Sequence, residues 1–193
     1  MLAIGESSPV RPESFDEYIC GDWDLWVLKH GLPEGVPEPV LGESVPVARW
    51  SGPSFGAVLQ IAWHFGVPDE EDSLVSEVRV YRRHGSSWEA SDGGGGTSWF
   101  NPPFVRPSGL GQRDVWGFHI HESGGDQWRC RSAGGFAGAD AVRVELHDSA
   151  GVTSSAIESP FGAFIVAWDA AEAVRLRVFD AQDVCMLDQE FAE

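Results

Sequence analysis

Basic residues are scarce in this chain, and their scarcity argues against one large class of partners. The 193 residues include 13 lysines and arginines against 30 aspartates and glutamates, a formal net charge of −17. The excess acid lies at the two ends, residues 1–40 and 138–193, whereas residues 41–137 are nearly balanced. Nucleic-acid binding depends on a basic footprint, so we expect no nucleic-acid partner. The acidity predicts a solubilising surface, with mimicry of nucleic acid as the less favoured alternative.

Cysteine and long apolar runs are also lacking. Cys20, Cys130 and Cys185 are odd in number, widely spaced and fit no zinc-ligand pattern, which favours reduced thiols in a cytoplasm. No apolar run approaches the roughly 20 residues that span a bilayer. Residues 1–17 lack the basic head and apolar stretch of a secretory signal. We therefore expect a cytoplasmic protein that contacts no membrane.

Uninterrupted helical sequence is rare, because 23 glycines and 12 prolines are spread along the chain. Apolar and polar residues alternate instead in AVRVELHD (141–148) and VRLRVFD (174–180), which predicts half-buried strands. The stretch GAFIVAW (162–168) is apolar without alternation, and this predicts a strand covered on both faces. Turn residues separate these segments, so we expect an antiparallel meander. The residues expected to face the core are Val142, Val144, Leu146, Val174, Leu176 and Val178.

The rest of the chain has the same character. Residues 24–30, 44–50, 57–65 and 76–84 are predicted strands, residues 14–20 a short helical turn, and residues 91–114 a long loop. The fold class expected is all-β: an antiparallel two-sheet sandwich, immunoglobulin-like in general architecture, with little helix. Residues 1–193 are expected to form a single β-rich domain. The glycine-rich segment 132–139 could be a hinge, but the strands after it would expose an apolar sheet face if they stood alone.

The stretch GFHIHESGG (117–125) is the best candidate for chemistry. On a strand, His119 and His121 project from the same face. The interpretation we favour is a pair of imidazoles facing solvent, with no cofactor. The alternative is a shared metal ion, for which a catalytic zinc would need a third protein ligand. Asp126 is the first candidate for that ligand, followed by His147, His64 and Glu122.

In this alternative, the chain resembles the cupin family. Cupins carry a histidine–any–histidine pair, a carboxylate four or five residues later, and a third histidine after a proline–any–glycine turn. His119, His121 and Asp126 are similar to the first motif, and residues 160–162 to the turn. Ile165 stands where the third histidine would fall, and Arg113 where a glycine would precede the first motif. The resemblance implies a metal-dependent enzyme that uses His119 and His121.

Tryptophan is abundant, with nine residues in the chain. Four of them lie inside apolar segments and are expected in the core: Trp26, Trp50, Trp63 and Trp168. Four others bracket the glycine-rich loop and the histidine segment, and they are candidates for contact with a ligand or partner: Trp88, Trp99, Trp116 and Trp128. Aromatic anchors are enriched at such surfaces. The single basic cluster, VYRRH (80–84), could contact acidic segments of the same or another chain.

Motifs of nucleophilic catalysis are missing. The chain has no GxSxG, no cysteine in an activating setting and no carboxylate pair with identifiable roles. The function expected is therefore non-catalytic: a cytoplasmic β-sandwich that acts through protein–protein interaction, with an unknown partner or by self-association. The alternatives are the cupin-like metal-dependent enzyme and a carbohydrate-binding module that uses exposed tryptophans.

Overall fold

A computed structural model describes residues 22–33, 44–64, 73–90, 96–100, 111–125, 128–159 and 162–192. The expected helical turn at 14–20 lies outside these residues. Their elements are, in chain order, α1 (Asp22–His30), β1 (Ser44–Ser51), β2 (Phe55–His64), β3 (Ser73–His84), β4 (Ser87–Ala90), β5 (Gly96–Phe100), β6 (Val115–Gly125), β7 (Trp128–Ala137), β8 (Ala141–Asp148), β9 (Gly151–Ala156), β10 (Ala163–Asp169), β11 (Val174–Asp180) and β12 (Cys185–Phe191). The all-β class expected from the alternation is confirmed.

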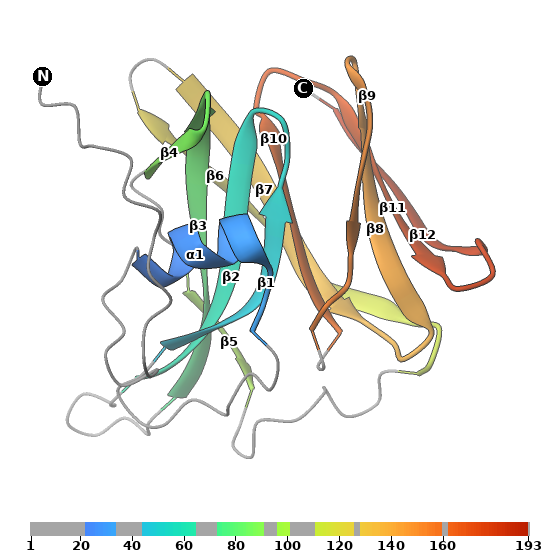
Figure 1. Cartoon of the computed structure of the whole chain (residues 1–193). Helices are drawn as coiled ribbons and strands as arrows, with labels where there is room; N and C mark the ends of the chain where they lie inside the picture. Colours follow the sequence, from blue (N-terminus) through green and yellow to red (C-terminus); the bar gives the residue numbers. More distant parts are fainter. Residues whose placement is uncertain are drawn as a thin grey trace, which may run out of the picture.

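The strands form three antiparallel sheets, where the sequence predicted two. Sheet A has the order β1-β2-β3-β4, with β5 also on β3; sheet B is β10-β7-β6 and sheet C is β12-β11-β8-β9. Figure 1 shows β10 and β7 of sheet B between sheet A and sheet C. One hydrophobic cluster takes buried side chains from all three sheets. The architecture is therefore sandwich-like, with an additional layer.

The middle layer follows from β10, whose apolar side chains lack alternation. From Ala163 to Trp168 every residue is buried, as predicted for a strand covered on both faces. The Trp168 ring packs on Phe191 of sheet C with centroids 5.3 Å apart. On the opposite face, Gly134 of β7 faces Ile165 of β10 and Leu59 of sheet A. An apolar strand needs a sheet on each side, and the predicted meander is wrong here because β10 pairs with β7.

A helix replaces one predicted strand. Residues 24–30 belong to α1, which packs Trp23, Val27 and Leu28 on Val58 and Tyr81 at the outer face of sheet A. Trp23 and Val27 are four residues apart and lie on one helical face. A short apolar segment such as this one fits a strand as well as a helix, and the spacing of four is the signal that favours the helix.

The sequence also placed Val142 in the core, and this is wrong. Val142 is 40% exposed, whereas the other five predicted core residues are buried. The pairing of β8 with β11 passes from Arg143 directly to Ala141, so Val142 is the extra residue of a β-bulge. A bulge reverses the faces of the residues beyond it. Ala141 consequently packs against the core and Val142 is turned to solvent.

The predicted loop at 91–114 and the possible hinge at 132–139 both contain strands. The predicted loop 91–114 contains β5, which pairs with β3. The glycine-rich segment 132–139 is mainly β7, a buried strand at the centre of sheet B.

Cys130 and Cys185 are free thiols, and burial raises the pKa of the Cys130 thiol to about 12. Among the described helical residues, none forms a helix of the length and apolarity that a membrane span requires.

Candidate functional site

The histidine segment forms β6, and its alternation is opposite to that expected. Ile120 is 52% exposed, whereas His121 on the other face is only partly exposed. Burial lowers the pKa of His121, because the charged imidazolium loses solvation. His121 is thus partly exposed, and that the two imidazoles face solvent together stays a prediction. The side chain of His119 and all of Asp126 lie outside the described residues.

The groups that could complete a metal site have other partners. Glu122 lies 3.4 Å from Arg129 Nη1 and 3.8 Å from Arg131 Nε. His147 lies on sheet C, where its Nε2 is 3.1 Å from Glu145 Oε2. Ile165, at the position of the third cupin histidine, is wholly buried in the core. In the part of the chain that the structure describes, no three histidine, cysteine, aspartate or glutamate side chains form a group suited to a metal ion.

The tryptophans divide between core and surface. Trp50 and Trp168 are buried, as predicted. Trp26 is half-buried on α1, between the rings of Trp23 and His30. Two of the surface candidates, Trp88 and Trp128, are half-buried. The side chains of Trp63, Trp99 and Trp116 lie outside the described part of the structure.

Trp88 of sheet A and Trp128 of sheet B each lie beside an arginine at the end of β3. The guanidinium of Arg83 is 5.2 Å from the centroid of the Trp88 ring, and that of Arg82 is 5.9 Å from the Trp128 ring. The Trp128 ring also contacts Phe55 at a centroid distance of 5.8 Å. We call Arg82, Arg83, Trp88 and Trp128 the arginine–tryptophan rim. Figure 1 shows β4 beside the end of β6 and the start of β7.

Local structure explains this arrangement. Consecutive residues of a strand project to opposite faces, so Arg82 and Arg83 at the end of β3 reach opposite sides of sheet A. The turn after β3 uses Gly85 at a φ of 61°, and it brings Trp88 opposite Arg83 in the β3–β4 ladder. A Cβ atom at Gly56 would lie 3.0 Å from the Trp88 ring, so glycine leaves room for the indole over the sheet.

The charge of the rim is unusual for this acidic protein. Every other described arginine has a carboxylate oxygen within 3.9 Å, and these arginines are Arg49, Arg79, Arg113, Arg129, Arg131, Arg143, Arg175 and Arg177. Among the described residues, Arg82 and Arg83 have no such carboxylate. Arg83 donates instead to the carbonyl oxygens of Gly85 and Gly52, at 3.2 and 3.5 Å. The rim therefore presents positive charge beside aromatic rings.

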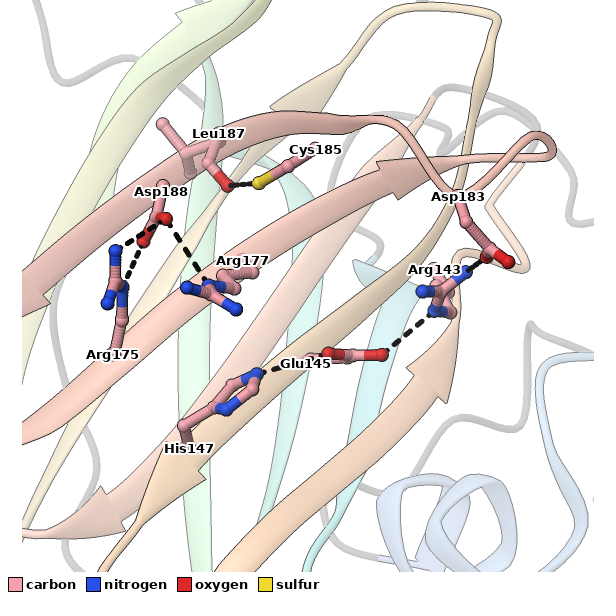
Figure 2. A network of polar contacts seen from close by, with 9 residues as sticks. All are labelled: Arg143, Glu145, His147, Arg175, Arg177, Asp183, Cys185, Leu187 and Asp188. Atoms are coloured by element: carbon pink, nitrogen blue, oxygen red, sulfur yellow. Dashed lines mark hydrogen bonds and ion pairs between the residues drawn. The ribbon is translucent and has the colours of Figure 1, made fainter.

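The outer face of sheet C shows the opposite arrangement (Figure 2). Glu145 accepts hydrogen bonds from Arg143 and His147, at 3.0 and 3.1 Å. Asp188 accepts hydrogen bonds from Nε and Nη2 of Arg175. Its Oδ2 atom also lies 3.3 Å from Arg177 Nε. This face carries many charges, but they neutralise one another.

An open cleft of about 690 Å³ lies at one end of sheet C. Its wall includes Arg175, which pairs with Asp188 and Glu190. It also includes Glu172, which accepts a hydrogen bond from Ser149 at 3.2 Å. Because these charged groups already have partners in the protein, the cleft offers a ligand fewer free charges than the rim does.

Comparison with protein-family models, with curated proteins and with solved structures finds no match. The geometry of the rim must therefore carry the functional assignment. Sequence reasoning identified Trp88, Trp128 and the basic cluster separately. The signal that could have joined them was the pair Arg82–Arg83 in a chain poor in basic residues. Their lack of carboxylate partners depends on tertiary structure and could not be read from the sequence.

Proposed function

We propose that this protein is a non-catalytic binding module whose arginine–tryptophan rim captures an acidic segment of a partner protein. The observation that carries the proposal is that Arg82 and Arg83 form no ion pair with a described carboxylate, although the chain has a net charge of −17. Glu89 stands opposite Arg82 in the β3–β4 ladder, but it binds His84 at 2.8 Å. An arginine over an aromatic ring keeps its donors available to a carboxylate. Arginine and tryptophan are also the residues most enriched at protein-binding hot spots.

A short acidic segment suits the rim better than nucleic acid does. The net charge of −17 repels both at long range, but nucleic-acid binding needs a wide basic footprint, whereas a carboxylate needs only the arginines of the rim at short range. Both described cysteines, Cys130 and Cys185, are free thiols, which supports the cytoplasm as the compartment. An immunoglobulin-like relation between the sheets remains part of the proposal, as a rigid scaffold with binding residues at the ends of its strands.

The carbohydrate-binding alternative has less support. Sugars stack on the open face of an aromatic ring. In the rim, the guanidinium groups of Arg82 and Arg83 already lie over the Trp128 and Trp88 rings. The metal-dependent alternative would need a third ligand near His121, and no such group is found among the described side chains.

The experiment measures binding of a fluorescent peptide rich in glutamate and aspartate, beside its glutamine and asparagine counterpart. Wild-type protein should prefer the acidic peptide, and salt should weaken the binding. The double variant Arg82→Gln/Arg83→Gln should bind at least about tenfold more weakly, a loss of about 1.4 kcal/mol. The matched control Arg175→Gln/Arg177→Gln has the same charge change on sheet C and should bind like the wild type.

Three outcomes would contradict the proposal. Equal weakening in both double variants would mean that overall charge, and not the rim, governs binding. An equal affinity for the acidic and neutral peptides would remove the role of the arginines. Stoichiometric metal that is lost on changing His119 and His121 to glutamine would favour the enzyme instead.

A further inference from the structure

The two outer strands of sheet C differ in a way that bears on assembly. On β12, Asp188 and Glu190 are exposed. On β9, the sequence GVTSSA contains no charge and no proline, and Val152 is 60% exposed, the most exposed large hydrophobic residue among those described. Natural proteins use charged residues to prevent a free edge from pairing with another strand. Figure 1 shows β9 and β12 as the two outer strands of sheet C. The β12 edge carries such charges, and the β9 edge has none.

The side chains of β9 are symmetric in character about Ser154. Val152, Ser154 and Ala156 lie opposite His147, Glu145 and Arg143 of β8, and therefore belong to the outer face of the sheet. Thr153 and Ser155 alternate with them and belong to the inner face. Read from Ser154 in either direction, the strand gives a hydroxyl residue and then an apolar one. A strand with this symmetry is complementary to itself when a second copy runs antiparallel.

We propose that two copies of this chain form a two-fold symmetric dimer by antiparallel pairing of β9 with β9, with the axis at Ser154. Val152 then lies opposite Ala156 of the second copy, and Thr153 opposite its Ser155. These are apolar and hydroxyl pairs of the kind that stabilise neighbouring strands. The register keeps the two inner faces on the same side, because outer residues meet outer residues. Two four-stranded sheets join into one continuous sheet.

Charge explains why an acidic chain can pair with itself at this edge. The charged residues nearest to β9 are those of β8, and there Arg143 and His147 already bind Glu145. Asp148 of β8 has no cation partner among the described residues, but it lies at the end of β9 and accepts hydrogen bonds from the backbone N–H groups of Ala150 and Gly151. Among the described residues, no bare carboxylate of β8 therefore lies opposite the centre of the contact. On β12 the edge strand itself carries Asp188 and Glu190, and pairing there would bring these carboxylates close to those of the second copy, although Arg175 offsets them in part.

This dimer goes beyond the proposed binding function, because the rim lies on sheets A and B and takes no part in the contact. Each copy would keep its rim, so a dimer would offer two acidic-segment sites. Two linked sites raise the avidity for a partner that carries two such segments. The two proposals can fail independently.

The test is the mass of the full chain by sedimentation velocity and light scattering, between about 1 μM and about 1 mM, where weak association is populated. Wild-type protein should approach twice 21.0 kDa as concentration rises. Ser154→Lys places two ammonium groups face to face at the axis and should give monomer, as should Ser154→Glu with two carboxylates. An equimolar mixture of the two variants should restore the dimer, because opposite charges then meet. Gln189→Lys, an exposed uncharged residue on β12, is the matched control and should leave the dimer intact.

Melting curves identify any variant that fails to fold, and the charge-swap mixture keeps the proposal testable because it requires recovery of a dimer. Wild-type protein that stays monomeric throughout would overturn the proposal. So would a dimer that persists in both Ser154 variants, a mixture that fails to associate, or a mass that grows beyond two chains. Peptide binding at the rim, measured on the same samples, should be unchanged by Ser154→Lys. A loss of the dimer and a loss of peptide binding are thus told apart.

Discussion

The outer faces of sheet A and sheet C differ in what covers them. On sheet A, Val58 and Tyr81 are buried beneath α1, which contributes Trp23 and Leu28. On sheet C no described helix lies over the outer face, and ion pairs such as Arg143–Glu145 cover it. A sheet face that carries apolar side chains needs another element over it, whereas one that carries paired charges can face water.

The polar group beneath α1 shows how closely the helix is fixed to sheet A. Asp24 is wholly buried. Its Oδ1 accepts a hydrogen bond from Gln60 Nε2 at 2.6 Å, and its Oδ2 accepts one from the Tyr81 hydroxyl at 2.5 Å. Burial raises the pKa of Tyr81, and the neighbouring Asp24 carboxylate raises it further. A buried carboxylate must be hydrogen-bonded, so we expect substitutions beneath α1 to cost far more than substitutions on sheet C.

The largest effect is expected for Trp23→Ala. It removes a buried aromatic side chain between α1 and sheet A, and the free energy of unfolding should fall by about 3–5 kcal/mol. The comparison variant is Phe179→Ala on the outer face of sheet C, where the Arg143 guanidinium lies 4.2 Å from the ring centroid. That change should cost about 1 kcal/mol or less. Urea denaturation measures both, and equal losses would break the contrast between the two faces.

An intermediate effect is expected for Tyr81→Phe. The variant keeps the ring but leaves Asp24 with one hydrogen bond fewer in a buried site, at a cost of about 1–3 kcal/mol. Ser87→Ala, which removes an exposed hydroxyl bonded to the His84 carbonyl at 2.9 Å, should stay within about 0.5 kcal/mol. Thermal and urea unfolding of the two variants give the comparison. A neutral Tyr81→Phe would mean that α1 is held by apolar contact alone.

The smallest effect is expected for Glu145→Gln on sheet C, and it depends on pH. Burial favours a higher pKa for Glu145, but the hydrogen bonds from Arg143 and His147 outweigh it and the pKa is lowered from 4.5. A lowered carboxyl pKa stabilises the folded state above about pH 4.5, and this contribution is lost as pH falls through the folded pKa. Glu145→Gln should lower stability at pH 7 by about 1 kcal/mol or less and reduce the loss on acidification. The control is Glu190→Gln, whose side chain is 77% exposed; if both variants respond to acid alike, Glu145 has no special role.

Local pattern was enough to predict part of this molecule. Alternation in β11 correctly placed Val174, Leu176 and Val178 in the core, and the unbroken apolar run of β10 correctly predicted two covered faces. Alternation failed at Val142, because a bulge depends on the neighbouring strand. It also failed to say which face of β6 would be exposed, since that depends on how sheet B packs. The sequence predicted Trp88, Trp128 and the basic cluster as separate candidates. It could not predict that they form one site, because the charge partners of an arginine come from distant parts of the chain.

The place of β10 has a consequence for how the chain folds. β8 and β11 are neighbours in sheet C, yet β9 and β10 lie between them in the sequence, and β10 belongs to sheet B. Sheet C therefore cannot be completed by adding successive hairpins as the chain leaves the ribosome. The β8–β9 hairpin can form early, but it must wait for β11, and β10 docks on β7 in between. Such non-local pairing is slow, on the order of milliseconds to seconds, and during this interval the apolar inner face of the β8–β9 hairpin lacks its neighbouring strand.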